Sequence, residues 1–237
     1  MISFKGKKIL ILAPHPDDEI LGCGGLISRA KREGAKIYVL YFTAGTTKDF
    51  SEKGFSTKEE RLEEIKKVAR FLKFDGWKII FPGEDYHLSL DKLPQKTIIN
   101  EIERGSKISL ETIKPSLLLI PHHQDYNQDH RAVGLASVAA TRPALRTHKS
   151  LQPFVLSYEY SSSHWNVSQN GSDKNFFVEL TKNDIAKKLR ALSLYKSQMK
   201  PHPHPHSLKS VKLFAELRGT QIGTNLAEAF LATRVTV

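Results

Sequence analysis

One imidazole and three carboxylates crowd into residues 14–19, Pro-His-Pro-Asp-Asp-Glu, directly after the apolar run at 9–13. Adjacent carboxylates repel one another and resist desolvation, so a buried cluster of this kind needs a proton or a cation to neutralise it. A divalent metal ion would do so. His15 and Asp18 are three positions apart, about one helical turn, so both can face one ion if the chain enters a helix after Pro16.

A second polar cluster, His-His-Gln-Asp-Tyr-Asn-Gln-Asp-His at 122–130, follows another apolar run. His130 would complete a set of two imidazole nitrogens and one carboxylate oxygen with His15 and Asp18. Three protein ligands leave a fourth position for water, as a catalytic zinc ion requires. The single cysteine, Cys23, allows neither a thiolate cage nor an internal disulfide. The sequence therefore favours zinc held by His and carboxylate, and the same donors also suit iron.

Asp17 is the acid that remains beside this set of candidate ligands. A carboxylate next to a metal, and not needed as a ligand, can take a proton from water and return it to a leaving group. The structural alternative for Asp17 is a helix N-cap, and the two roles are compatible. We expect Glu19 to cap or orient its neighbours rather than to bind the metal.

Length and composition describe one globular α/β domain with a basic surface. The chain has 237 residues, 40% of them hydrophobic, and a formal net charge of +11. Its lysine pairs are isolated, which favours a solvated basic surface over a nucleic-acid site and leaves attraction of an anionic substrate as a milder option. No apolar run approaches the ~20 residues of a membrane span. The N-terminus leads into a strand rather than a cleavable signal, so a cytoplasmic protein is expected.

Strand and helix patterns alternate along the first two thirds of the chain. Apolar runs predict strands at 8–13, 36–42, 77–81, 116–120 and 154–160. Helical patterns predict helices at 26–33, after a glycine-rich turn at 22–25, and at about 56–73, 94–114 and 131–140, with a polar loop at 43–56. Such alternation predicts βαβ units and a mostly parallel sheet, a Rossmann-like three-layer α/β sandwich.

The last third is less regular, and we expect a single domain over 1–237 with a C-terminal extension from about 161. A loop is expected at 161–174, and helices at 182–198 and 207–217. The alternating Pro-His run at 201–206 predicts an extended, polyproline-like segment. Its histidines would splay around the axis and could not converge on one ion, so a loop or lid role is favoured over a metal role.

The expected topology brings the two polar clusters together. In an open parallel sheet, ligands bind beyond the carboxyl ends of the strands, near the point where strand order reverses. The cluster at 15–19 follows the first strand, the usual switch strand, and the cluster at 122–130 follows the fourth, its expected neighbour. Neither cluster alone is sufficient evidence for a metal site, but their convergence at one crevice predicts one.

These motifs closely resemble those of the PIG-L/LmbE-like zinc de-N-acetylases, which remove acetyl from N-acetylglucosamine-type groups. The resemblance rests on Pro14-His15-Pro16-Asp17-Asp18-Glu19, Gly22-x-Gly24-Gly25 and Asp125-x-Asn127-x-Asp129-His130-Arg131. Less specific support comes from Arg61-x-x-Glu64, Asp85, Glu159 with its serine loop, and Ala227-Glu228-Ala229-Phe230. The matching positions span nearly the whole chain.

The resemblance implies a role for each matching residue of the two main motifs. His15, Asp18 and His130 would be the zinc ligands, and Asp17 would be the general base. The implied reaction is metal-assisted amide hydrolysis, in which an N-acetylated sugar loses acetate and becomes an amino sugar.

Two further positions match family residues that hold sugar hydroxyls, namely Arg61 and Asp85. From the sequence alone, purely structural roles are equally compatible with both residues. Arg61 could form an ion pair with Glu64 on a helix surface, and Asp85 could be a turn acid.

One position departs from the family pattern. Many members place a histidine three residues before the last ligand, where it polarises the amide carbonyl and is tuned by the aspartate beside that ligand. Here the two positions are Asn127 and Asp129, which we expect to be catalytic residues of a variant site. An asparagine amide can donate to an oxyanion but cannot carry a positive charge. His122 or His123 could substitute for the missing histidine.

Two other functions are compatible with the sequence. One is hydrolysis of a different amide or of a small-metabolite adduct on the same scaffold. The other is a non-enzymatic basic protein that binds nucleic acid. The sequence leaves open which N-acetyl sugar is used, whether it is free, nucleotide-linked or lipid-linked, and whether the chain forms a homo-oligomer.

Overall fold

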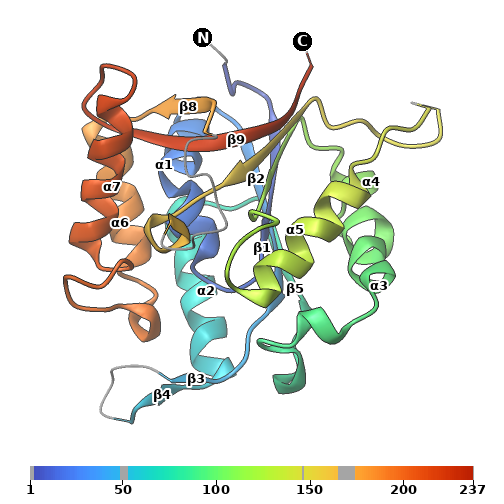
Figure 1. Ribbon diagram of the computed structural model, residues 1–237, viewed down its shortest axis with the longest axis horizontal. Coiled ribbons are helices and arrows are strands. Elements are labelled where there is room, and N and C mark those ends of the chain that lie inside the picture. Colours follow the sequence, from blue (N-terminus) through green and yellow to red (C-terminus); the bar gives the residue numbers. More distant parts are fainter. Residues whose placement is uncertain (1–2, 49–52, 146, 165–173, 237) are drawn as a thin grey trace.

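The computed structural model describes residues 3–48, 53–145, 147–164 and 174–236, and its main sheet has helices on both faces (Figure 1). The strands of this sheet are β1 Lys8–Ala13, β2 Lys36–Thr43, β5 Gly76–Phe81, β6 Leu117–Ile120, β7 Phe154–Tyr158, β8 Phe176–Glu179 and β9 Ala227–Val235. A separate hairpin consists of β3 Thr47–Lys48 and β4 Phe55–Ser56.

The α-helices are α1 Asp18–Arg32, α2 Lys58–Leu72, α3 Gln95–Asn100, α4 Leu110–Ile113, α5 Gln128–Ala140, α6 Lys182–Leu192 and α7 Leu208–Thr220. Short 3₁₀ helices cover Glu84–Tyr86, Leu90–Lys92, Ser161–His164 and Lys196–Gln198, and a π-helical turn covers Glu101–Gly105. The expected single helix at 94–114 is thus broken into α3, the π-helical turn and α4.

The strand order is β5-β2-β1-β6-β7-β9-β8. Strands β5, β2, β1, β6 and β7 are parallel to one another, and β9 is antiparallel to both β7 and β8. Because β1 is hydrogen-bonded to both β2 and β6, the strand order reverses at β1, and the carboxyl ends of β1 and β6 are adjacent. The predicted parallel sheet and the predicted neighbour of the first strand are confirmed.

The sheet separates two hydrophobic cores. Ile9 and Ile11 of β1 face the core under α1, α2, α6 and α7, whereas Leu10 and Leu12 face the core under α3, α4 and α5 (Figure 1). A strand covered on both faces buries its side chains in both directions, which explains why β1 is apolar throughout. Helices therefore pack against both faces of β1 and hold its carboxyl end in place.

The expected glycine-rich turn at 22–25 is wrong, because these residues lie inside α1, which begins at Asp18. A Cβ atom on Gly22 would lie 2.4 Å from Cδ2 of Tyr158, and one on Gly25 would lie 2.4 Å from Cδ1 of Leu180. The glycines therefore allow close packing of the helix rather than a turn. As a result, α1 begins directly at the polar cluster that follows β1.

The C-terminal third also differs from the expected pattern. Strands β8 and β9, which were not predicted, extend the sheet, and the helix expected at 182–198 ends at Leu192. The loop expected at 161–174 lies mostly outside the described residues, although Ser161–His164 forms a short helix. Within the described ranges, no helix combines the length and apolarity that crossing a bilayer would require.

The extended conformation predicted for residues 201–206 is also wrong. The backbone N–H of His204 donates to the carbonyl of Pro201 at 3.0 Å, and that of Ser207 donates to the carbonyl of His204 at 2.9 Å. Proline lacks an N–H, but its carbonyl still accepts, so the run can form hydrogen-bonded turns. The turns end where the Ser207 hydroxyl caps α7.

Candidate active site

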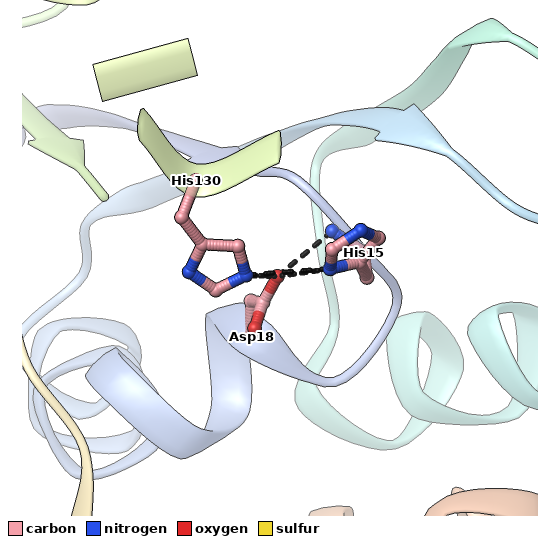
Figure 2. Close-up of side chains that lie close together, drawn as sticks. All are labelled: His15, Asp18 and His130. Carbon is pink, nitrogen blue, oxygen red and sulfur yellow. Dashed lines mark hydrogen bonds and ion pairs between the residues drawn. The ribbon is translucent and has the colours of Figure 1, made fainter. Parts of the chain in front are cut away.

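The structure brings the three predicted metal ligands together at the ends of β1 and β6. His15 lies in the short connection between β1 and α1, Asp18 is the first residue of α1, and His130 lies in the first turn of α5. Oδ2 of Asp18 is 3.4 Å from Nδ1 of His15 and 3.2 Å from Nε2 of His130 (Figure 2). The two ring nitrogens are 3.3 Å apart. All three residues are buried.

The electrostatics of this cluster fit a cation. One ligand atom from each residue lies within 4.8 Å of the others. Burial alone would lower the pKa of His130, but the Asp18 and Asp125 carboxylates raise it to about 10. Burial would raise the pKa of Asp18, but the charges and hydrogen bonds of His130 and His15 hold it far below its usual range. Positive charge therefore stabilises the buried carboxylates. Two imidazole nitrogens and one carboxylate oxygen are ligands that suit zinc or iron.

Each histidine is oriented by a carboxylate on its other nitrogen. Nε2 of His15 donates to Oδ2 of Asp129 at 2.9 Å, which leaves the Nδ1 lone pair facing Asp18. Nδ1 of His130 lies 3.5 Å from Oδ2 of Asp125. Such outer carboxylates fix the tautomer and ring orientation of metal-binding histidines. Asp129 is held in turn by two backbone N–H groups, those of residues 88 and 90, each at 2.9 Å.

Asp17 has an unusual backbone conformation beside the cluster. Its φ is 112°, in the left-handed region that non-glycine residues rarely adopt. Its carbonyl accepts from the N–H groups of Ile20 and Leu21, but its side chain makes no capping hydrogen bond, so the carboxylate is not used as an N-cap. Burial and the neighbouring Asp18 charge raise the pKa of Asp17 well above its usual range.

Glu19 holds this conformation in place, as expected for a residue that orients its neighbours. The backbone N–H of Asp17 donates to Oε2 of Glu19 at 3.1 Å. The hydroxyl of Tyr195 donates to Oε1 of Glu19 at 2.6 Å and lies 3.2 Å from the hydroxyl of Tyr41. Burial raises the pKa of Glu19 to about 7. Tyr195 was not predicted, because it lies 176 residues from Glu19 along the chain, between α6 and α7.

Arg61 lies in α2 beneath the same turn. Arg61 is only 1% exposed, so it does not form an ion pair on the helix surface. Nη2 of Arg61 donates to the carbonyl of Pro16 at 2.9 Å. Its charge opposes the effect of burial on the pKa of Asp17. The carboxylate of Glu64, the alternative partner, accepts from the N–H and hydroxyl of Ser197.

Asp85 is exposed in the 3₁₀ helix Glu84–Tyr86, and His87, two residues later, reaches the cluster instead. The ring of His87 contacts that of His15 edge to face, with centroids 5.1 Å apart, and its Nδ1 is 3.2 Å from Oγ1 of Thr43. His87 was not among the predicted site residues. Its position just after the carboxyl end of β5 is the signal that could have identified it.

Asn127 is the N-cap of α5. Its Oδ1 accepts from the backbone N–H of Asp129 at 2.9 Å, which orients the side-chain amide and leaves its nitrogen as the donor for a ligand. His122 and His123, the suggested substitutes, stack on each other with centroids 5.0 Å apart, and Nδ1 of His122 accepts from the N–H of Gln124. Among the described residues, the groups that could hold a metal ion include neither histidine.

The sequence is similar to a family model and to a named relative. Residues 10–141, more than half of the chain, match the family model described as "PIG-L: GlcNAc-PI de-N-acetylase". The diacetylchitobiose deacetylase of Thermococcus kodakarensis is 27% identical over 200 residues, which cover 81% of this chain and 70% of that protein.

Solved structures share the whole architecture. The conserved protein TT1542 from Thermus thermophilus has a TM-score of 0.73 and 25% identity, covering 98% of this chain and 96% of that one. GalB, the 4-carboxy-2-hydroxymuconate hydratase from Pseudomonas putida, has a TM-score of 0.70 and 17% identity, covering 98% of both chains. Because a hydratase has the same fold, structural similarity alone does not identify the reaction. The family of this chain is therefore assigned from the match to the family model. By that match, the chain belongs to the PIG-L family of de-N-acetylases.

Proposed function

We propose that the protein is a metal-dependent hydrolase that removes the acetyl group from an N-acetylglucosamine-type sugar or sugar conjugate, releasing acetate and an amino sugar. The observation that carries the proposal is the buried set of His15, Asp18 and His130 with Asp17 beside it, in a chain of the PIG-L family. The name of the Thermococcus kodakarensis relative, a diacetylchitobiose deacetylase, supports an N-acetylated sugar as the substrate class.

Zinc is the proposed metal, with iron as the alternative, and His15, Asp18 and His130 would hold it. When bound, a zinc ion lowers the pKa of water toward ~7 and stabilises negative charge on a polarised carbonyl oxygen. Asp129 and Asp125 keep the two imidazoles in the tautomers that binding requires.

Asp17 is the proposed proton carrier. Its raised pKa brings the carboxylate closer to the range in which a group can both accept and return a proton near neutral pH. Asp17 takes a proton from the attacking water, a new C–O bond forms at the acetyl carbon, and the C–N bond then breaks. Asp17 returns the proton to the departing nitrogen, so one water is consumed for each acetate and amine produced.

The remaining predicted residues have supporting roles in this proposal. The amide nitrogen of Asn127 would donate to the oxyanion, since its oxygen is already engaged by the backbone of α5. Arg61 supports the turn that carries Asp17 through its hydrogen bond to Pro16. Arg61 and Asp85 remain candidates for contacts with sugar hydroxyls, Asp85 from an exposed position.

A reaction panel tests the proposal. Zinc-loaded protein is incubated with N-acetylglucosamine, diacetylchitobiose and a nucleotide-linked N-acetylglucosamine, and acetate and primary amine are measured together. We expect equal amounts of the two products from at least one sugar, and loss of both after chelation. Acetate without the amine, or activity that is independent of metal, would contradict the proposal. Activity only on amides other than N-acetyl sugars would favour the alternative hydrolase.

A further inference from the structure

The Pro-His run at 201–206 is a sequence feature that the proposed reaction leaves unused. The run forms two hydrogen-bonded turns, and its three histidines differ in exposure. His202 is exposed, whereas His204 and His206 are partly buried. Ser207 follows at once as the N-cap of α7, so the position of the run is tied to a regular element. Identical side chains in one short segment therefore have different surroundings.

His206 is fixed by the segment that follows β7. Nε2 of His206 lies 2.9 Å from Oγ of Ser162, and the hydroxyl of Ser161 donates to the carbonyl of Pro205 at 2.5 Å. The backbone N–H of His206 donates to Nδ1 of His204 at 3.1 Å. Together these contacts hold the His206 ring in one orientation.

One aromatic ring separates His206 from a candidate metal ligand. The rings of His206 and Tyr160 meet edge to face, with centroids 5.7 Å apart and an interplanar angle of 81°. The hydroxyl of Tyr160 is 2.8 Å from Nδ1 of His130. The charges of Asp18 and His130 act on the His206 imidazole. His206 therefore lies one ring away from the metal cluster, on the side of His130.

The imidazole of His206 has the hydrogen-bonding character that a hydroxyl group requires. Burial, followed by the nearby charge of His204, lowers the pKa of His206 to about 4, so the ring is neutral near pH 7. A neutral imidazole carries one N–H donor and one acceptor. Within the described residues, the Nε2 atom contacts Ser162, and the Nδ1 atom has no hydrogen-bond partner. A sugar hydroxyl both donates and accepts, so it can hydrogen-bond to Nδ1 whether or not this nitrogen carries the proton of the neutral ring.

We propose that His206 is a substrate-binding residue that hydrogen-bonds a hydroxyl group of the sugar beside the metal cluster, an inference that rests on the proposed function. Tyr160 provides the apolar support for the ring, and Ser162 fixes its rotation. The turn that ends at Ser207 joins His206 directly to the start of α7, so the same segment that begins the helix presents this side chain to Tyr160 and Ser162.

Paired substitutions separate binding from packing. His206→Phe keeps an aromatic ring against Tyr160 but removes both nitrogens, whereas His206→Gln keeps a donor and an acceptor but removes the ring. His202→Ala is the matched control, because His202 is exposed in the same segment. We expect His206→Phe to raise KM about 3- to 10-fold, as for loss of one net hydrogen bond, with kcat within about twofold. His206→Gln should lie closer to wild type, and His202→Ala should equal it.

A binding measurement gives a readout that does not depend on turnover. N-acetylglucosamine is titrated calorimetrically into zinc-loaded Asp17→Asn protein with and without His206→Phe, and the zinc content and melting temperature of each variant are measured. We expect Kd to rise by the same factor as KM at unchanged zinc content.

Wild-type values of KM and Kd in His206→Phe would overturn the inference. So would a loss of zinc or of thermal stability that accounts for the change, because His206 would then have a structural role only. If wild-type protein released no acetate from any sugar, the proposed deacetylation would fail, and the titration would still decide whether His206 contacts the sugar.

Discussion

Asp129→Asn is expected to weaken zinc binding while it preserves the shape of the site. The carboxylate accepts three hydrogen bonds, from Nε2 of His15 and from the backbone N–H groups of Leu88 and Leu90, each at 2.9 Å. An asparagine has one acceptor oxygen, so its NH₂ group must face at least one of these donors. If it faces His15, that ring needs a lone pair on Nε2 and carries its proton on Nδ1, the nitrogen expected to bind the metal.

The size of the effect follows from what such outer carboxylates contribute. Loss of one typically weakens metal binding about 10- to 100-fold, which is about 1.4–2.7 kcal/mol. If the NH₂ group instead faces Leu90, the cost is an unsatisfied buried donor, about 1–3 kcal/mol of unfolding free energy.

Zinc affinity is measured by competition with a chromophoric chelator, and stability by urea unfolding of the metal-free protein. Asp91→Asn, at an exposed neighbouring position, is the control. An Asp129→Asn protein with wild-type zinc affinity and wild-type stability would refute the assigned role of Asp129.

Three further predictions concern residues around the site. Gly22→Ala should lower the unfolding free energy by about 1–3 kcal/mol in urea titrations, because the new Cβ would lie 2.4 Å from Cδ2 of the buried Tyr158; unchanged stability would show that α1 is not tightly packed there. Asn127→Ser keeps an N-cap acceptor but removes the amide donor, so kcat should fall at least tenfold at unchanged stability and zinc content; unchanged kcat would limit Asn127 to capping. Burial lowers the pKa of His122 to about 4 from its ordinary 6.5, so the neutral ring stabilises the fold above pH 6.5 and this contribution is lost as the pH falls toward 4. When the pH is lowered from 7.5 to 5, the wild-type protein should therefore lose more stability than His122→Gln, as measured by their urea midpoints. A difference between the two midpoints that does not change with pH would contradict this.

The sequence was sufficient to predict the parallel part of the sheet. Strands β1, β2, β6 and β7 are largely buried, β5 is a partly exposed edge strand, and the apolar runs of all five stand out from the helices between them. The usual strand order of such sheets places the ends of the first and fourth strands side by side, so the sequence alone predicts the convergence of His15 and Asp18 with His130. The cluster in the structure confirms that convergence.

What the sequence could not predict depends on contacts between distant segments. The glycines of α1 looked like a turn because their packing partners, Tyr158 and Leu180, lie more than 130 residues away. Strand β9 was missed because it pairs antiparallel with β7 and β8, outside the strand-helix alternation. His206 could not be placed, because local hydrogen bonds rather than proline content decide whether a Pro-His run is extended or turned.

The proposed reaction requires that a metal held by His15, Asp18 and His130 work together with Asp17 to hydrolyse an N-acetyl amide. Zinc content and acetate release are therefore measured for wild-type protein and for Asp17→Asn, a substitution that suits the left-handed backbone at this position. We expect equal zinc content and a fall in kcat of about 10²- to 10⁴-fold, as for loss of a general base. An Asp17→Asn protein that binds zinc and retains kcat within a few-fold of wild type would contradict this mechanism.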